Sequence, residues 1–445
     1  MSSSTMIIGD TRDVMATMPD GSVDLVLTSP PFLALRSYLP AGHPDKHKEI
    51  GSEPTPAEFL DTLLALTAEW GRLIAPHGSI AVELGDTYAG SGGAGGDCSE
   101  GGLRESQQAF SGSAKKRAEN GLADGGRPSR ASRDDGWPLA KSMCLIPHAY
   151  AMSLAYGRNI LTGQPSPAGM WRVRNVVAWC RPNPAVGALG DKYRPATSFM
   201  VIATRAVDRW FDLDAVRVPA DPANKRPSAL VRKDIGGRTD QVCNPLGEDG
   251  QRIISNAAGA PPLDHVGLRN DEADLFIDDA WLVSTESYSG SHYATWPRKL
   301  LGQPILSMCP KEVCTACGEP RRRMVGEPTY VQTRNGGTPA ILNMREGQQV
   351  DALTKQWLPT AEARGDNGVT RQVETLGWTD CGCGAPFRRG HVLDPFGGSG
   401  TTAVVATGLG RDCTLIDLDE RNADLAQERV GMFLTVHHHN AVEAS

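Results

Sequence analysis

Two short stretches near opposite ends of the chain hold the residues whose types and spacing suggest chemistry. The C-terminal stretch, residues 391–402 (HVLDPFGGSGTT), joins an apolar run to a carboxylate, a glycine-rich turn and two threonines. Glycines at such a turn allow positive φ and let the backbone approach a ligand, whose polar atoms can meet the free amides of a helix N-terminus. The pattern is typical of a strand, a ligand-holding loop and a helix, although dinucleotide enzymes and simple tight connections use similar turns.

The N-terminal stretch is a tetrad that follows the β-type run 22–27 and Thr28, and its members are Ser29, Pro30, Pro31 and Phe32. Two consecutive prolines continue neither a helix nor a central strand, so they fix the chain just past the strand's C-terminal end. Ligands of open parallel sheets bind at that end. Considered alone, the two prolines could equally be a simple strand terminator.

Together the two stretches resemble the paired signatures of S-adenosylmethionine-dependent DNA amino-methyltransferases, and their order along the chain resembles the β class. The resemblance implies methyl transfer to an exocyclic amine of a base flipped out of double-stranded DNA. Phe32 would stack on the base, while Ser29 and the carbonyl of Pro30 would accept hydrogen bonds from its amine. The cofactor residues expected in these stretches and after the first strand are Asp10, Thr28, Asp394, Pro395, Phe396, Gly398, Ser399, Gly400, Thr401 and Thr402. Asp10 could also be no more than a helix N-cap.

Three further cofactor residues are expected. Asp417 ends an apolar run about twenty residues after the glycine loop, which is the spacing at which a Rossmann-like unit binds ribose hydroxyls. Residues 291–300 are similar to the family segment that lines the methionine end of the cofactor, so His292 and Thr295 are candidates. His292 could equally be a structural hydrogen-bond donor.

The target-base pocket and the target base follow from the same resemblance. Trp179 and Asn183 are candidates for the pocket wall, although a core role is equally open for Trp179. Serine at the first tetrad position is more usual for the N4 amine of cytosine and aspartate for the N6 amine of adenine, so cytosine is expected and adenine is the alternative. Methylation at C5 of cytosine would need a Pro-Cys pair, which the sequence lacks.

Two other classes of protein stay open as alternatives. A zinc-bearing DNA-binding protein with a degenerate methyltransferase fold would have no physical need for both intact stretches. A nicotinamide dehydrogenase would have no use for the proline tetrad.

Five of the ten cysteines fall in two tight groups. Cys314 and Cys317 form one glycine-containing turn, and Cys381 and Cys383 form another. Four thiolates match a structural tetrahedral zinc ion, with free buried thiols as the alternative. Cys309 is expected to be a core thiol.

The composition sets limits on partners and location. The chain has 445 residues and a net charge of −7, which argues against a protein that coats nucleic acid by bulk electrostatics but allows a locally basic face. It has neither a signal pattern nor a run of eighteen apolar residues, so a cytoplasmic protein without a membrane partner is expected. Double-stranded DNA is the expected partner. A second copy of the chain and a cognate restriction endonuclease of a restriction-modification system are further candidates.

The elements that must position these residues predict an α/β fold. The family resemblance implies the architecture, a Rossmann-like methyltransferase with a seven-stranded mixed sheet, helices on both faces and insertions. The strands that end at Leu27 and Asp394 should lie side by side, which brings Phe32 and Phe396 to one edge. A capping box at 55–58 predicts a helix to about residue 74, with a turn at 76–78 after it, and the spacing of apolar residues over 423–434 predicts a closing helix.

Seven segments are expected along the chain. They are the catalytic-motif half of the methyltransferase domain (1–88), a flexible Gly/Ser/basic insertion (89–136), the continuation of the domain (137–218), a target-recognition region (219–280), a cofactor-side segment (281–308), a zinc-knuckle insertion (309–390) and the cofactor-binding half (391–445).

Overall fold

The computed structural model of the chain divides into two compact units. The first comprises residues 1–212, 270–322 and 380–445, and the second comprises 213–269 and 323–379. The residues that the structure describes are 2–35, 38–40, 42–89, 136–184, 192–216, 275–277, 279–286, 296–327, 329–333, 340–342, 368–372 and 374–439. His292, Thr295, the interior of the expected insertion 89–136 and most of the expected recognition region 219–280 therefore lie outside the described residues.

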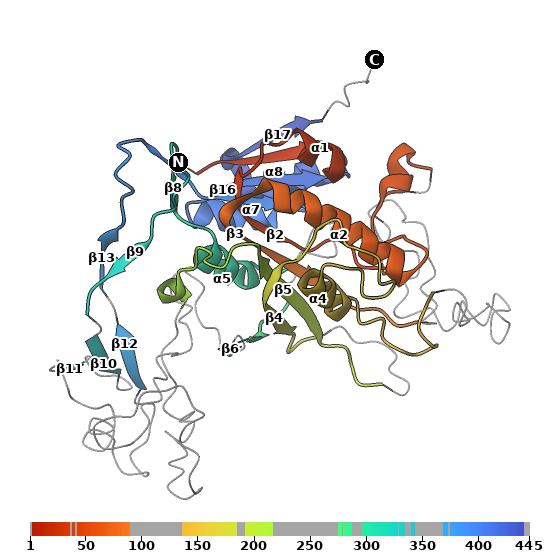
Figure 1. The fold of residues 1–445 in the computed structure, drawn as a ribbon, viewed down its shortest axis with the longest axis horizontal. Helices are drawn as coiled ribbons and strands as arrows, with labels where there is room; N and C mark the ends of the chain where they lie inside the picture. The colour runs from red at the N-terminus through yellow and green to blue at the C-terminus, as the bar shows by residue number, and fades with distance from the viewer. Residues whose placement is uncertain are drawn as a thin grey trace, which may run out of the picture. The chain divides into compact units, whose positions relative to one another are not determined.

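A ten-stranded mixed sheet forms the centre of the first unit (Figure 1). Its strands are β1 (Ser4–Ile8), β2 (Val23–Thr28), β3 (Ile74–Leu84), β4 (Arg172–Cys180), β5 (Thr197–Thr204), β6 (Leu275–Ile277), β7 (Ala280–Leu282), β15 (His391–Asp394), β16 (Asp412–Asp417) and β17 (Leu434–His438). Their order is β17-β1-β16-β15-β2-β3-β5-β4-β7-β6. Strand β5 is antiparallel to both of its neighbours, β3 and β4, and the edge strand β6 is antiparallel to β7. All other neighbouring strands are parallel.

This sheet confirms the expected α/β, Rossmann-like class. It has ten strands where seven were expected, because β17 extends one edge and β7 and β6 extend the other. Residues 275–277 and 280, which fall in the expected target-recognition region, contribute to that second edge.

Helices cover both faces of the sheet (Figure 1). On one face lie α1 (Thr11–Thr17), α2 (Pro56–Leu73) and α4 (Ile146–Tyr156), and on the other lie α5 (Arg298–Met308), α7 (Thr401–Gly408) and α8 (Arg421–Val430). Three short 3-10 turns, η1 (Pro44–Lys48), η2 (Leu213–Val216) and η6 (Gly431–Phe433), complete the described helical segments. In the described part of the chain, no helix is long and apolar enough to cross a membrane.

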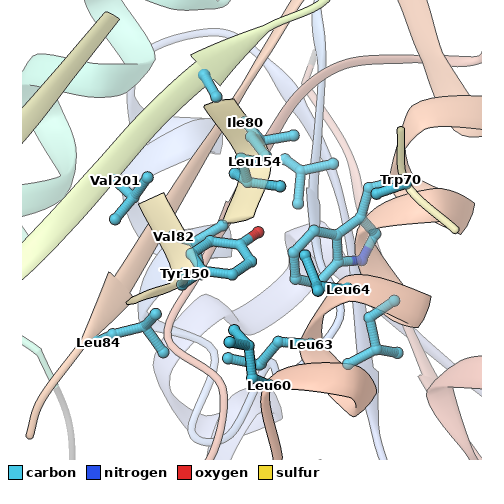
Figure 2. Packing of buried hydrophobic residues seen from close by; sticks show 14 of the residues in the cluster. Leu60, Leu63, Leu64, Trp70, Ile80, Val82, Leu84, Tyr150, Leu154 and Val201 are labelled. Atoms are coloured by element: carbon cyan, nitrogen blue, oxygen red, sulfur yellow. The ribbon is translucent and has the colours of Figure 1, made fainter. Parts of the chain in front are cut away.

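The predicted capping box begins α2. Thr55 Oγ1 accepts a hydrogen bond from the Glu58 amide at 3.2 Å, and the Glu58 carboxylate accepts one from the Thr55 amide at 3.1 Å. The apolar face of the helix then packs on the sheet beside α4. Figure 2 shows this core, to which α2, β3, α4 and β5 contribute Leu60, Leu63, Leu64, Trp70, Ile80, Val82, Leu84, Tyr150, Leu154 and Val201. Burial of this apolar surface fixes β3, and through it β2, in the centre of the sheet.

The two signature stretches leave the sheet from neighbouring strands. β15 pairs in parallel with β2, with Val392 opposite Leu25 and Leu393 opposite Val26. Parallel neighbours end at the same edge of a sheet, so the tetrad and the glycine loop begin side by side. The prediction that these strands are adjacent is confirmed.

Two expectations about local structure were wrong. The closing helix ends at Val430, because Gly431 has a φ of +69°, and Leu434 begins β17 instead. The expected turn at 76–78 belongs to β3, which begins at Ile74 and carries a register irregularity opposite the Val23–Leu25 segment of β2.

The second unit contains two small antiparallel sheets. One has the order β11-β10-β12, formed by Ala340–Leu342, Thr329–Thr333 and Gly368–Gln372, and the other pairs β13 (Thr375–Trp378) with β9 (Arg323–Val325). The low periodicity of residues 318–380 did not predict these strands. A further pair, β8 (Glu312–Cys314) with β14 (Phe387–Arg389), belongs to the first unit.

Candidate active site

A cavity of about 770 Å³ lies where β1, β2, β3, β15 and β16 end. Its volume falls within the range of typical small-molecule sites. The lining includes most of the residues expected from the sequence, namely Asp10, Ser29, Pro30, Pro31, Phe32, Trp179, Asn183, Pro395, Phe396, Gly398, Ser399, Thr401 and Asp417. The tetrad and the glycine loop therefore share one cavity, as their adjacent strands predicted.

Four expected cofactor residues do not line the cavity: Thr28, Asp394, Gly400 and Thr402. The Asp394 carboxylate is only 1% exposed and accepts hydrogen bonds from the hydroxyls of Thr28 at 2.7 Å and Thr402 at 2.5 Å. It also accepts one from the Phe396 amide at 3.1 Å. Burial raises the pKa of Asp394 to about 6. The carboxylate thus ties β2, β15 and α7 together beneath the loop.

Gly400 shapes the loop from behind the cavity wall. It caps α7 in the left-handed region with a φ of +80°, and a Cβ there would lie 3.0 Å from the Cβ of Ala426. Only glycine adopts this backbone without strain in so small a space.

A second buried carboxylate, Glu83, meets the tetrad on the other side of β2. The Ser29 hydroxyl donates to Glu83 Oε2 at 2.5 Å, and Ser198 also hydrogen-bonds this carboxylate. Glu83 is 3% exposed, and burial raises its pKa above the ordinary value despite these hydrogen bonds and the nearby charge of Arg181. Unlike Asp394, Glu83 lines the cavity.

Glu83 is a site residue that sequence reasoning missed. It is the only charged residue in the apolar run 79–84, and a carboxylate within a buried strand was the available signal.

The glycine loop is held by residues of β16 and α8. Asp417 accepts hydrogen bonds from the Gly398 amide at 2.7 Å, from the Asp419 amide at 2.8 Å and from the Asn422 side chain at 3.0 Å. Burial raises the pKa of Asp417 to about 6. Arg429 Nη1 donates to the hydroxyls of Ser399 and Thr401, so their side chains are already engaged inside the protein.

Asp10 is both the N-cap of α1 and a residue of the cavity wall. Its carboxylate caps α1 by accepting from the Arg12 amide at 2.9 Å, and it also lines the cavity. Although burial disfavours its charge, hydrogen bonds from Arg12 and the charge of that guanidinium lower the pKa of Asp10.

The far wall of the cavity contains Trp179, Arg181 and Asn183. Trp179 Nε1 donates to the Val283 carbonyl at 2.8 Å. The Asn183 side chain accepts from the Thr285 amide at 3.0 Å and donates to the Thr285 carbonyl at 3.4 Å. These bonds fix both expected wall residues to the segment after β7.

A family model described as DNA methylase, of the N6/N4 methyltransferase type, matches residues 23–314 and 387–428. The matched ranges make up more than half of the chain and contain both signature stretches. The chain belongs to the N6/N4 DNA methylase family.

Relatives of this DNA methylase share its sequence over part or most of its length. The Type II methyltransferase M.SfiI of Streptomyces fimbriatus is 25% identical over 214 residues, which covers 48% of this chain and 39% of that protein. The Type II methyltransferase M.XycI of Xanthomonas campestris pv. cyanopsidis is 25% identical over 303 residues, which covers 67% of this chain and 70% of that protein. Among solved structures, the PvuII DNA methyltransferase (cytosine-N4-specific) aligns with a TM-score of 0.44 and 12% identity over 96% of this chain and 86% of that one.

The methylase also contains a four-cysteine cluster that the family model leaves largely unmatched, since the match is interrupted between residues 314 and 387. The Sγ atoms of Cys314, Cys317, Cys381 and Cys383 all lie within 4.8 Å of one another. Three glycines in the two turns, Gly318, Gly382 and Gly384, have φ values of +73°, +75° and +65°. Pairing of β8 with β14 brings the turns together. Cys309 is fully buried outside the cluster, which confirms its expected place as a core thiol.

Proposed function

We propose that this DNA methylase transfers a methyl group from S-adenosylmethionine to the N4 amine of a cytosine flipped out of double-stranded DNA. The observation that carries the proposal is the hydrogen bond from Ser29 to Glu83 in a cavity shared with the glycine loop. The choice of cytosine over adenine is supported by serine at the first tetrad position.

The tetrad offers the incoming amine acceptors without donors. When Glu83 is ionised, it takes the only hydroxyl proton of Ser29 as a hydrogen bond, and the lone pairs of Ser29 Oγ are left for the amine. Pro30 and Pro31 have no amide hydrogen, so they present no backbone donor to the amine. The Pro30 carbonyl adds a second acceptor. Two hydrogen bonds to these acceptors would draw the amine's lone pair out of conjugation and aim it at the methyl carbon. The proton that the amine loses would pass to Ser29 while the Ser29 proton passes to Glu83.

Phe32 would stack on the flipped base. Its ring lies against Gly85, where an added Cβ would come within 2.6 Å of the ring carbon Cε2. Any larger residue after β3 would therefore displace the ring. Stacking on an aromatic ring offsets part of the few kcal/mol that flipping a base costs, roughly 1–3 kcal/mol per base in single-strand binders.

The cofactor would occupy the other half of the cavity. Bound S-adenosylmethionine supplies a methyl group that its sulfonium has already activated. Asp417 accepts three hydrogen bonds within the protein, and a carboxylate has about four acceptor positions, so one is left for a ribose hydroxyl. Backbone groups of Pro395, Phe396 and Gly398 would line the remainder, with His292 and Thr295 proposed at the methionine end.

The DNA would meet the two polar segments outside the described residues. We assign sequence reading to the region 219–280, because the family has its target-recognition region after the strands that β4 and β5 resemble. We assign phosphate contact to the insertion 89–136, because it contains clusters of lysine and arginine. The Type II description of the relatives motivates a cognate restriction endonuclease as a separate partner, and a second copy of the chain is a further proposal.

We also propose that the four-cysteine cluster holds a structural zinc ion. A tetrahedral zinc ion with bonds of about 2.3 Å places its sulfur ligands roughly 3.8 Å apart, which agrees with four Sγ atoms within 4.8 Å of one another. Thiolates at two glycine turns form a ligand set suited to zinc and to no step of methyl transfer.

Expression in a host that lacks DNA methylation tests the proposed activity. Mass spectrometry of the host nucleosides should detect N4-methylcytosine, and a Ser29→Ala control should give none. N6-methyladenine would instead support the alternative base. No modified base from a folded protein that binds S-adenosylmethionine would favour a non-catalytic DNA-binding protein, and binding of NAD without S-adenosylmethionine would contradict the cofactor.

A further inference from the structure

One cation on the cavity wall has no part in the amine chemistry just described. Arg181 follows β4 directly and lines the cavity together with Ser29 and Glu83. Its guanidinium carbon lies 4.9 Å from the centre of the Trp179 ring, and its backbone amide donates to the Ala196 carbonyl at 2.8 Å. Stacking on the indole and a fixed backbone hold the planar guanidinium in one orientation.

A short chain of hydrogen bonds joins Arg181 to the tetrad. Arg181 Nη1 donates to Ser198 Oγ at 3.0 Å, Ser198 hydrogen-bonds Glu83, and Glu83 accepts from Ser29 at 2.5 Å. Ser198 is only 1% exposed, so this series of hydrogen bonds lies inside the protein. The guanidinium and the Ser29 hydroxyl are therefore fixed on the same wall, with Glu83 between them.

The guanidinium has donors to spare. Arginine carries five N–H groups and no acceptor. Within the described residues, this guanidinium donates one hydrogen bond, to Ser198. The remaining N–H groups of a cavity-lining cation can meet only acceptors. The wall thus presents a group that can only donate hydrogen bonds, beside the tetrad that would accept hydrogen bonds from the amine.

This arrangement matches the edge of cytosine better than that of adenine. Next to its N4 amine, cytosine presents two acceptors in succession, N3 and O2. Next to its N6 amine, adenine presents the acceptor N1 and then a C–H group. A planar fork of N–H groups can donate to both cytosine acceptors, whereas adenine would leave one buried donor unpaired, which is costly.

We infer that Arg181 reads N3 and O2 of the flipped cytosine and so determines the target base. The inference rests on the proposed methyl transfer and adds to it the residue that selects the base. When no DNA is bound, Ser198 accepts a hydrogen bond from the cation, and Trp179 stacks against it.

Arg181→Met tests the inference, because methionine keeps an apolar stem against Trp179 and removes every donor. Unmethylated genomic DNA of the host and labelled S-adenosylmethionine serve as substrates. We expect kcat/KM for cytosine to fall about 5- to 150-fold, the usual range for losing one bidentate base contact, and the ratio of N4-methylcytosine to N6-methyladenine to fall as well. Cofactor affinity by calorimetry should stay within twofold, and Arg181→Lys should recover part of the loss. An unchanged kcat/KM and product ratio would overturn the inference and leave the proposed function intact.

A measurement on the wild-type protein keeps the test independent of the variant's folding. Once sequencing of the host DNA gives the recognition site, a duplex with 3-deazacytosine at the target position lacks the N3 acceptor but keeps the amine. Wild-type protein should methylate this duplex at least fivefold more slowly than the normal one, and Arg181→Met should show a smaller difference between the two duplexes, because the contact is already lost. Equal rates of the wild-type protein on both duplexes would overturn the inference. If the wild-type protein methylates adenine, the proposed function itself fails, which is a different result.

Discussion

Two buried carboxylates flank strand β2 and accept hydrogen bonds from consecutive residues of the same chain segment. Asp394 on β15 accepts from Thr28 at 2.7 Å, and Glu83 on β3 accepts from Ser29 at 2.5 Å. Burial raises the pKa of both. Asp394 faces two threonine hydroxyls and a backbone amide beneath the loop, whereas Glu83 faces the cavity. Burial and a raised pKa therefore do not distinguish a carboxylate of the cavity wall from one that supports the loop beneath it, and of the two only Glu83 lines the cavity.

The largest expected effect is that of substituting Ser29, which lines the cavity and donates a hydrogen bond to Glu83. Ser29→Ala should lower single-turnover methyl transfer at least about 10³-fold, because one acceptor for the amine and the proton path are both lost. Cofactor affinity should stay near the wild-type value. Ser79→Ala is a matched control, since the buried Ser79 hydroxyl has no hydrogen-bond partner among the residues that the structure describes. Turnover retained by Ser29→Ala would show that the tetrad is not catalytic.

Substitution of the two carboxylates should separate their roles. Glu83→Ala should lower the single-turnover rate about 10²-fold, while Glu83→Gln should lose less, because its amide oxygen still accepts the Ser29 hydroxyl. Asp394→Ala should instead lower the free energy of unfolding by about 2–5 kcal/mol, since it leaves the hydroxyls of Thr28 and Thr402 without their acceptor. Denaturant unfolding and rapid-quench kinetics measure the two quantities. A rate loss for Asp394→Ala in folded protein as large as that for Glu83→Ala would contradict the distinction.

A smaller effect on activity is expected at the cysteine cluster, which does not line the cavity. We expect about one zinc ion per chain by metal analysis, with Cys314→Ser or a strong chelator removing the metal and lowering the melting temperature. Turnover per folded molecule should change far less than in Ser29→Ala. Cys180→Ser, outside the cluster, should keep its zinc. Metal-free wild-type protein that melts at the same temperature would exclude the zinc proposal.

Features that depend on neighbouring residues in the chain were predictable from the sequence. The Pro30-Pro31 pair, the glycine turn after Asp394 and the capping box at Thr55 act locally, so their elements could be placed. The adjacency of β2 and β15 followed from the family resemblance, and the strand pairing confirms it.

Features set by tertiary contacts were not predictable. Glu83 became a site residue only when β3 placed it beside Ser29, 54 positions away in the chain. Helix α4 has no side-chain cap and begins after Leu145 in a left-handed conformation, and α5 contains Pro304, so neither carries a clear start signal or an uninterrupted pattern. Thr28, Asp394, Gly400 and Thr402 do not line the cavity for a related reason, because proximity in sequence to a glycine loop does not say which residues face the cavity; their assignment to cofactor contact stays a prediction.

The pH dependence of single-turnover methyl transfer tests the central distinction between the two carboxylates most directly. In the proposed mechanism Ser29 is an acceptor for the amine only while Glu83 is ionised, and burial raises the pKa of Glu83 above its ordinary value of 4.5. The rate should therefore be full above that raised pKa and fall as the pH drops through it. In Glu83→Gln this acidic limb should disappear, whereas Asp394→Asn should keep it. An acidic limb that persists in Glu83→Gln, or that vanishes in Asp394→Asn, would contradict the account.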